Sequence, residues 1–256
     1  MKRLLIAMLI ALPGLAGAQG LLDFRHDLAF KAQTVNAVAE RAYRARLRAY
    51  AADGRLDANP ELLVRLHRLL VQLLPAARYE RPDAASIAWE IHTCRRCDEN
   101  ASAMAGGKLL VGEEFVRKLA LSDDELGYVL AHEMAHVLAE HTREFATTAR
   151  FFMGNGRNRD YEDIQNELHE SYSVNLRMAP LIVQQELEAD YMGFVLGARS
   201  GFDPDAMPRF LRKLGDEPVS MLSLNVSTRQ RIAQAEAMLQ SARRIREIGV
   251  PGGALR

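Results

Sequence analysis

The chain has 256 residues, of which 48% are hydrophobic and 26% charged, and its 33 Lys and Arg balance 33 Asp and Glu. The formal net charge of zero argues against a nucleic-acid-binding protein, because such proteins carry a marked basic excess. The apolar fraction excludes a wholly disordered chain and predicts a packed globular core organised as one or two domains.

Residues 1–18 have the composition of a cleavable signal peptide. Lys2 and Arg3 precede an unbroken apolar run over residues 4–12, and residues 16–18 (Ala-Gly-Ala) are the small residues that a signal peptidase accepts. The run is shorter than the roughly 20 residues of a spanning helix, although an uncleaved membrane anchor is the alternative. We expect cleavage after Ala18, a periplasmic location, and a soluble mature chain without a membrane span.

Periodicity and capping residues then predict a mostly helical chain with a small sheet. Two early helices are expected, one from Leu21 to Ala52 and one from Pro60, after the N-cap Asn59, to Leu74 before Pro75. Alternating apolar residues predict a strand over 86–92, and a second apolar strand follows over 108–111. The remaining helices are expected over residues 122–141, 161–172, 180–201, 204–214 and 228–248.

The helix over residues 122–141 carries the sequence His132-Glu133-Met-Ala-His136. Ser122 and Glu125 form a capping box that opens this helix. Because a helix turns about 100° per residue, the two histidines lie about 40° apart and can reach one metal ion. Glu133 lies beside them, where a general base for an activated water belongs.

A catalytic zinc site needs a third protein ligand. Thr142 and Ala139 exclude the pattern in which a third His follows at the tenth position, and His141 lies about 140° around the helix from His136. We interpret His141 as a polar residue near the helix end. A carboxylate is the other option, and Glu186 and Asp190 share one face of an otherwise apolar helix, as one ligand and one partner for a ligand imidazole.

The sequence here resembles the metallopeptidase family that includes HtpX, the CAAX prenyl proteases, BepA and LoiP. The resemblance covers about residues 85–240. It rests on residues 126–137, on Glu186-Leu-Glu-Ala-Asp190 with Gly193, on Ser227-Thr-Arg-Gln-Arg-Ile232, and on the loop 100–103 before the strand 108–111. It implies a mostly helical α+β, zincin-like fold with a small β-sheet beside the zinc-binding helix.

The resemblance also implies roles for individual residues. His132, His136 and Glu186 would bind one Zn²⁺ per chain, Glu133 would be the general base, and Asp190 would orient a ligand His or assist proton transfer. The strand 108–111 would be the sheet edge on which an extended substrate adds a strand. The family often has a His-Pro pair where this chain has Asn225-Val226, which leaves the oxyanion stabiliser unassigned.

These inferences predict a zinc metalloendopeptidase that hydrolyses unfolded or misassembled envelope proteins. The alternative is a chaperone-like or adaptor protein that keeps its zinc mainly for structure, and Asn225-Val226 is the feature that favours it. A non-peptidase zinc hydrolase has no sequence feature in its favour. The chain would comprise a signal peptide (1–18), an N-terminal helical region packing on the catalytic domain (19–84), the peptidase domain (85–248) and a tail (249–256).

Two features remain open. Cys94 and Cys97 are expected to form a disulfide, with a redox motif or a second metal site using His92 as the alternatives. The N-terminal helices are expected to brace the catalytic part. The alternative is a docking surface for an envelope partner, suggested by the arginines at positions 41, 44, 46 and 48.

Overall fold

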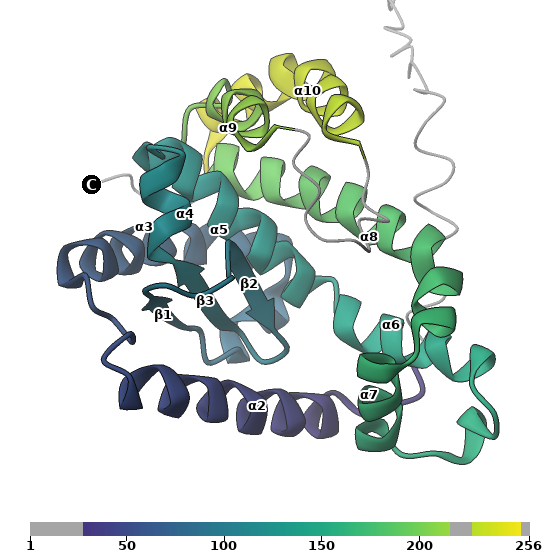
Figure 1. Ribbon diagram of the computed structural model, residues 1–256. Coiled ribbons are helices and arrows are strands. Elements are labelled where there is room, and N and C mark those ends of the chain that lie inside the picture. Colours follow the sequence, from purple (N-terminus) through teal and green to yellow (C-terminus); the bar gives the residue numbers. More distant parts are fainter. Residues whose placement is uncertain (1–27, 216–226, 252–256) are drawn as a thin grey trace, which may run out of the picture.

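The computed structural model describes residues 28–215 and 227–251 (Figure 1). The expected signal peptide and the Asn225-Val226 pair lie outside these described residues. Within them, no helix combines the length and the apolar composition that crossing a membrane requires. The division of the chain at residue 84 stays a prediction.

Nine α-helices, three short 3₁₀-helices and three strands form this described part. The strands are β1 (Glu90–Cys94), β2 (Ala101–Met104) and β3 (Lys108–Gly112). The helices are α2 (Ala32–Ala52), α3 (Pro60–Glu80), α4 (Glu113–Lys118), α5 (Asp123–Leu138), α6 (His141–Ala149), α7 (Tyr161–Glu170), α8 (Tyr172–Arg199), α9 (Ala206–Leu214) and α10 (Thr228–Ile248). The expected mostly helical fold with a small sheet beside the helix of His132 and His136 is confirmed.

The sheet has the strand order β1-β3-β2. β1 runs parallel to β3, with Ile91 opposite Leu109, and β2 runs antiparallel to β3, with Ala103 opposite Leu109. The prediction that the strand over 108–111 is a sheet edge is therefore wrong, because β3 is central and all five of its residues are buried. The edge next to α5 is β2, a segment that the sequence had suggested was a loop.

Helices cover both faces of this sheet. On one face Tyr43 of α2 packs with Leu110, and the Tyr43 hydroxyl donates a hydrogen bond to the Leu109 carbonyl at 2.7 Å. On the other face Leu109 and Val111 join the main core with α3 and α5. Figure 1 shows α8 on the far side of α5, so that α5 lies between the sheet and α8.

Two helices run through prolines that were expected to bound them. α3 continues past Pro75 to residue 80, and α8 begins at residue 172, after the N-cap Ser171, and continues through Pro180. Both prolines are exposed, so the carbonyl that loses its helical partner can bind water. Ala76 and Ala77 are fully buried, and their packing holds the last turn of α3 in place.

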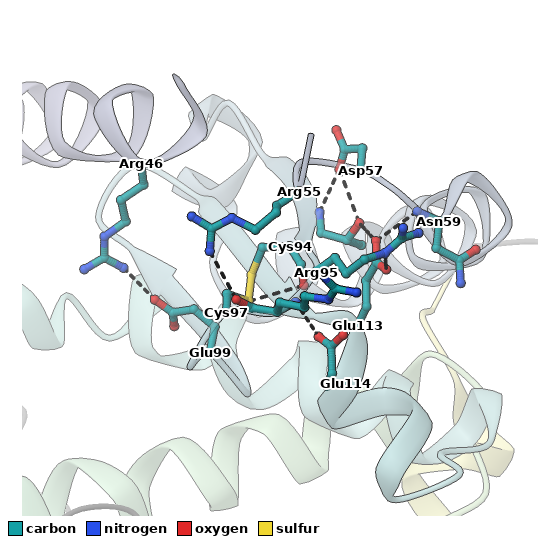
Figure 2. Close-up of a disulfide and its surroundings, with 12 residues drawn as sticks. Arg46, Arg55, Asp57, Asn59, Cys94, Arg95, Cys97, Glu99, Glu113 and Glu114 are labelled. Atoms are coloured by element: carbon teal, nitrogen blue, oxygen red, sulfur yellow. Dashed lines mark hydrogen bonds and ion pairs between the residues drawn. A yellow bond between two sulfur atoms is a disulfide. The ribbon is translucent and has the colours of Figure 1, made fainter. Parts of the chain in front are cut away.

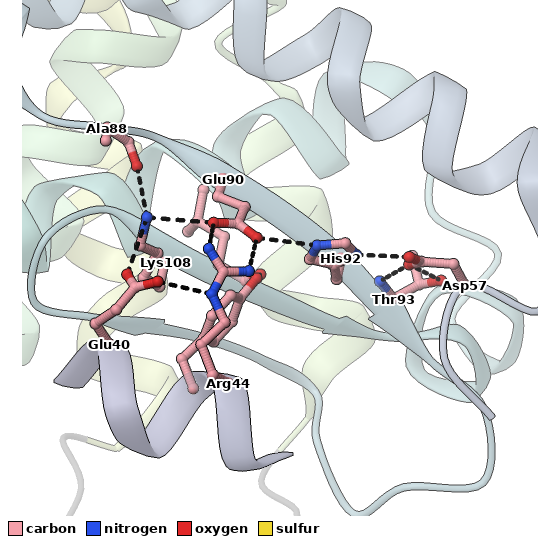
Figure 3. A network of polar contacts seen from close by, with 10 residues as sticks. Glu40, Arg44, Asp57, Ala88, Glu90, His92, Thr93 and Lys108 are labelled. Atoms are coloured by element: carbon pink, nitrogen blue, oxygen red, sulfur yellow. Dashed lines mark hydrogen bonds and ion pairs between the residues drawn. The ribbon is translucent and has the colours of Figure 1, made fainter. Parts of the chain in front are cut away.

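A polar network ties α2 to the sheet (Figure 3). The Arg44 guanidinium binds both carboxylate oxygens of Glu90 at 2.5 and 2.6 Å, and Lys108 Nζ lies 3.2 Å from the same carboxylate. Burial alone would raise the pKa of Glu90, but its bonds to Arg44, Lys108 and His92 lower it to about 2. Glu90 is therefore an ionised link between two elements that are far apart in sequence.

The arginines of α2 are largely engaged within the chain. Besides the Arg44 pair, Arg41 pairs with Glu162 at 2.8 Å and Arg46 with Glu99 at 2.9 Å. These contacts support the interpretation of α2 as a brace, because ion pairs within the chain already occupy three of the four arginines that suggested a docking surface.

Cys94 and Cys97 form the expected disulfide (Figure 2). The neighbouring loop is fastened from two sides: the Arg96 amide donates to Glu114 at 2.8 Å, and the Arg96 carbonyl accepts from Arg55 at 3.1 Å. His92 contacts Asp57 and Glu90 through its two ring nitrogens. The disulfide excludes the second metal site that would have needed free thiolates.

Candidate active site

The helix α5 presents the predicted residues on a rigid support. The capping box forms as predicted: the Glu125 amide donates to the Ser122 hydroxyl at 3.2 Å, and the Ser122 amide donates to the Glu125 carboxylate at 2.8 Å. Leu126, Leu130 and Met134 are fully buried, and they lie on the face of α5 opposite the two histidines. This anchoring fixes the direction in which His132, Glu133 and His136 project.

Three ligand atoms converge on one point between α5 and α8. The Nε2 atoms of His132 and His136 are 3.1 Å apart, and the Glu186 oxygens lie 3.6 Å from the first and 3.4 Å from the second. Ligand atoms of a tetrahedral zinc site are separated by about 3.3 Å, given bonds of about 2.0–2.1 Å. Among the described residues these three form the one group with metal-binding spacing, and their donor set fits zinc.

The far side of the His132 ring faces a second carboxylate of α8. Nδ1 of His132 is buried, and the polar atom of the described residues that pairs with it is Oδ1 of Asp190, at an ion-pair distance of 3.0 Å rather than in an aligned hydrogen bond. A carboxylate can only accept, so this nitrogen carries a proton, and Nε2 is the ring nitrogen that faces Glu186 and His136. The structure thus places Asp190 beside the His132 imidazole, as the sequence predicted, on the ring nitrogen that does not face Glu186 and His136.

Arg231 of α10 completes this arrangement and was missed by the sequence analysis. Its guanidinium binds both oxygens of Asp190 at 2.7 Å each. Burial alone would raise the pKa of the Asp190 carboxyl, but His132 and Arg231 hold it below its ordinary value. The signal for Arg231 was present in the 227–232 motif, to which no chemical role had been given.

His141 also lies in the site, contrary to its interpretation as a polar residue at a helix end. α5 stops at Leu138, and Glu140 adopts the left-handed conformation with φ 56°. The chain therefore turns, and Nδ1 of His141 comes to 2.8 Å from Nδ1 of His136. The predicted separation of about 140° assumed one continuous helix, which the turn at Glu140 interrupts.

The three candidate ligands have strongly shifted pKa values. Burial acts to lower the pKa of His132, but the Asp190 and Glu186 carboxylates raise it to about 10, while burial and the neighbouring His132 lower that of His136 to about 3. The pKa of Glu186, which burial would raise, is lowered to about 2 by His132. A carboxylate, a neutral imidazole and an imidazolium that a metal can deprotonate therefore share this site.

Glu133 has a different environment from the ligand carboxylate. Its side chain is partly buried, and burial raises its pKa to about 7, although the charge of the neighbouring His132 acts to lower it. A carboxyl group with a pKa near 7 can both accept and release a proton at neutral pH. Glu133 thus has the proton affinity required of a general acid and base.

A cleft of about 710 Å³ opens in front of these residues. One stretch of its wall is the segment 98–103, which includes the free edge of β2. The wall also includes apolar residues of α4, α5 and α9: Phe115, Val129, Met207, Phe210 and Leu214. The cleft combines a strand edge, an apolar wall and a metal-binding group.

The sequence profile of peptidase family M48 matches residues 62–242, which is more than half of the chain. The chain belongs to peptidase family M48. The predicted family and enzyme class, a metallopeptidase with a zincin-like fold, are confirmed by this match. The group of His132, His136 and Glu186 described above falls inside the matched region.

Curated relatives of this M48 chain agree on the enzyme class. It is 29% identical to the mitochondrial metalloendopeptidase OMA1 of Arabidopsis thaliana, over 63% of this chain and 34% of the relative. It is 28% identical to the OMA1 of Saccharomyces cerevisiae, over 75% of this chain and 60% of the relative. It is 32% identical to the beta-barrel assembly-enhancing protease of Escherichia coli O157:H7, over 46% of this chain and 26% of the relative. The matches thus span less than two thirds of each relative.

These relatives contradict the predicted periplasmic location. The two OMA1 proteins are mitochondrial by name, and they match a larger part of this M48 chain than the bacterial protease does. The prediction rested on residues 1–18, which lie outside the described residues. An apolar run after two basic residues does not by itself fix the compartment.

Proposed function

We propose that this chain is a zinc-dependent endopeptidase whose metal ligands are His132, His136 and Glu186. The observation that supports this most directly is the convergence of their three ligand atoms within 4.8 Å of one another, next to Glu133. A structural zinc site has four protein ligands, whereas three ligands beside a base and an open cleft are typical of a catalytic site.

Each residue then has a defined task. Zinc held by His132, His136 and Glu186 would supply Lewis-acid chemistry for a peptide carbonyl and for a water molecule near neutral pH. Glu133 accepts the proton of the attacking water at its carboxylate and donates it to the leaving nitrogen. Asp190, held by Arg231, accepts the Nδ1 proton of His132 and so keeps its Nε2 lone pair on the metal side.

We propose that the substrate is an extended segment of an unfolded or misassembled protein. The free edge of β2 borders the cleft and can pair with a peptide backbone irrespective of its sequence. This edge replaces the strand 108–111 of the original prediction. The name of the bacterial relative, a beta-barrel assembly-enhancing protease, supports a role in protein assembly or quality control.

The test is cleavage of casein, a disordered protein, by the zinc-loaded chain and by Glu133→Gln. The variant removes the proton acceptor while keeping the three ligands, so we expect it to bind zinc normally and to lose activity by a factor of about 10² to 10⁴. Glu162→Gln, which alters an exposed carboxylate paired with Arg41, is the matched control and should cleave like the wild type.

Other outcomes lead to different conclusions. Equal cleavage by the wild type and by Glu133→Gln would refute the assignment of the base. Zinc bound at one ion per chain without cleavage by either protein would instead support the chaperone-like or adaptor role. Absence of zinc binding in the wild type would refute the ligand set itself.

A further inference from the structure

His136 has a second neighbour behind its metal-facing edge. Its Nε2 points to His132 and Glu186, and its Nδ1 lies 2.8 Å from Nδ1 of His141. The two rings are 4.9 Å apart and nearly perpendicular, at 76°. The side chain of His141 is only 4% exposed, so water has little access to replace it.

The position of the proton in this pair follows from the next contact. Nε2 of His141 lies 3.5 Å from Oε2 of Glu188, a carboxylate that can only accept. His141 therefore carries its proton on Nε2, and its Nδ1 has a lone pair. That lone pair accepts the Nδ1 proton of His136, which leaves the Nε2 lone pair of His136 directed at the metal position.

The backbone of His141 is held as well as its ring. The buried Gln185 donates from Nε2 to the His141 carbonyl at 3.2 Å and to the Glu144 carboxylate at 2.7 Å. Gln185 and Glu188 are three residues apart on α8, so they project from neighbouring positions on that helix toward α6. They flank Glu186, the metal ligand from the same helix.

We propose that His141, held by Glu188 and Gln185, is a positioning residue that fixes the orientation and tautomer of the ligand His136. The inference rests on the proposed zinc site and extends it. His132 has its acceptor in Asp190, and His136 has its acceptor in His141, so each imidazole ligand is oriented by a separate outer partner. Such partners typically change metal affinity by about 10- to 100-fold when removed.

The test compares His141→Leu with His141→Asn in the full chain. Asn can place its amide oxygen near the position of Nδ1 and accept the His136 proton, whereas Leu fills the space without an acceptor. Zinc affinity is measured by competition with a chromogenic chelator at pH 7.5. We expect His141→Leu to bind zinc about 10- to 100-fold more weakly and His141→Asn to stay within a few-fold of wild type.

Comparing His141→Leu with His141→Asn distinguishes a positioning role of His141 from a packing role. If His141 only filled space, the apolar Leu would be tolerated better than the smaller, polar Asn in this buried place. The proposal would be overturned if His141→Leu bound zinc as tightly as His141→Asn. It would also be overturned if both variants lost zinc affinity equally while their metal-free melting temperatures stayed unchanged. If His141→Leu fails to fold, the comparison of Glu188→Leu with Glu188→Gln replaces it. We expect a several-fold loss of zinc affinity for Glu188→Leu only, and equal zinc affinities of the two variants would overturn the proposal.

The two proposals fail in different measurements. Absence of cleavage or of zinc binding is seen in the wild type and concerns the proposed function. The role of His141 is decided by the difference between the Leu and Asn variants in zinc affinity, which requires no peptidase activity.

Discussion

Gly193 of α8 packs directly against the backbone of α5, and its replacement by Ala tests whether this close approach of the two helices sets the site. A Cβ atom at position 193 would lie 2.8 Å from both the Cα and N atoms of His132 and 3.1 Å from the carbonyl carbon of Ala131. These are backbone atoms inside α5, so they cannot rotate aside as a side chain would. The two helices would have to separate.

The size of the effect follows from two opposing contributions. Ala is favoured over Gly in a helix interior by up to about 1 kcal/mol, while overpacking a tight contact costs about 1–3 kcal/mol. Restoring an ordinary carbon contact of about 3.5 Å requires a shift of roughly 0.7 Å. Because α8 carries Glu186 and Asp190, we expect a net loss of about 1–2 kcal/mol in the free energy of unfolding and at least tenfold weaker zinc binding.

Urea unfolding of the metal-free protein and chelator competition for zinc measure the two effects. Gly197→Ala is the matched control, because its Cβ would meet the Tyr128 ring at 2.3 Å, one turn farther along α8. It should destabilise the fold and leave zinc affinity nearly unchanged. Gly154, with no atom within 4 Å of its Cβ position, gives the baseline. If Gly193→Ala had the same stability and zinc affinity as Gly154→Ala, the close approach of α8 to α5 at Gly193 would not be what sets the site.

Two further predictions concern stability away from the site. The pKa of Glu90, lowered from 4.5 to about 2, corresponds to at most about 3 kcal/mol of stability. Because the folded-state pKa is the lower one, this contribution is complete above pH 4.5 and is lost as the pH falls toward 2. We therefore expect Glu90→Gln, which leaves Arg44 and Lys108 without their carboxylate, to destabilise the chain at pH 7. Urea unfolding should show the difference from wild type shrinking below pH 4.5, and a pH-independent difference would contradict this. Replacing Cys94 and Cys97 by Ala should lower the unfolding free energy by about 2 kcal/mol, as expected for so short a loop. Casein cleavage should stay intact, and its loss in a folded variant would contradict the expectation that the disulfide has only a structural role.

The part of the site that the sequence predicted lies on regular helices. His132, Glu133 and His136 share a face of α5, and Glu186 and Asp190 share a face of α8, because both segments keep the helical period. Local spacing is sufficient information for such groups. The pairing of the two helices, in contrast, was inferred from the need for a third metal ligand and from the resemblance to a family, because neither segment's own periodicity indicates which helix packs against it.

The elements that were predicted wrongly depend on contacts between distant segments. β2 has the sequence Ala-Ser-Ala-Met, which is no strong strand former, and it is a strand because β3 offers it a partner. Pro75 lies within α3 because buried alanines follow it. The turn at Glu140 has no glycine to announce a left-handed residue. No local pattern distinguishes these cases from a loop, a helix end or a continuous helix.

The turn at Glu140 and the spacing of α8 residues are parts of one arrangement. Glu186 and Asp190 face the metal position and His132, while Gln185 and Glu188 face His141 on α6. One helix can serve both groups only if α6 lies beside α8, which requires α5 to end shortly after His136. A straight continuation of α5 would carry His141 away from His136, so that His132 would keep its partner and His136 would have none. The left-handed residue between the two helices is therefore a condition for orienting the second imidazole of the site.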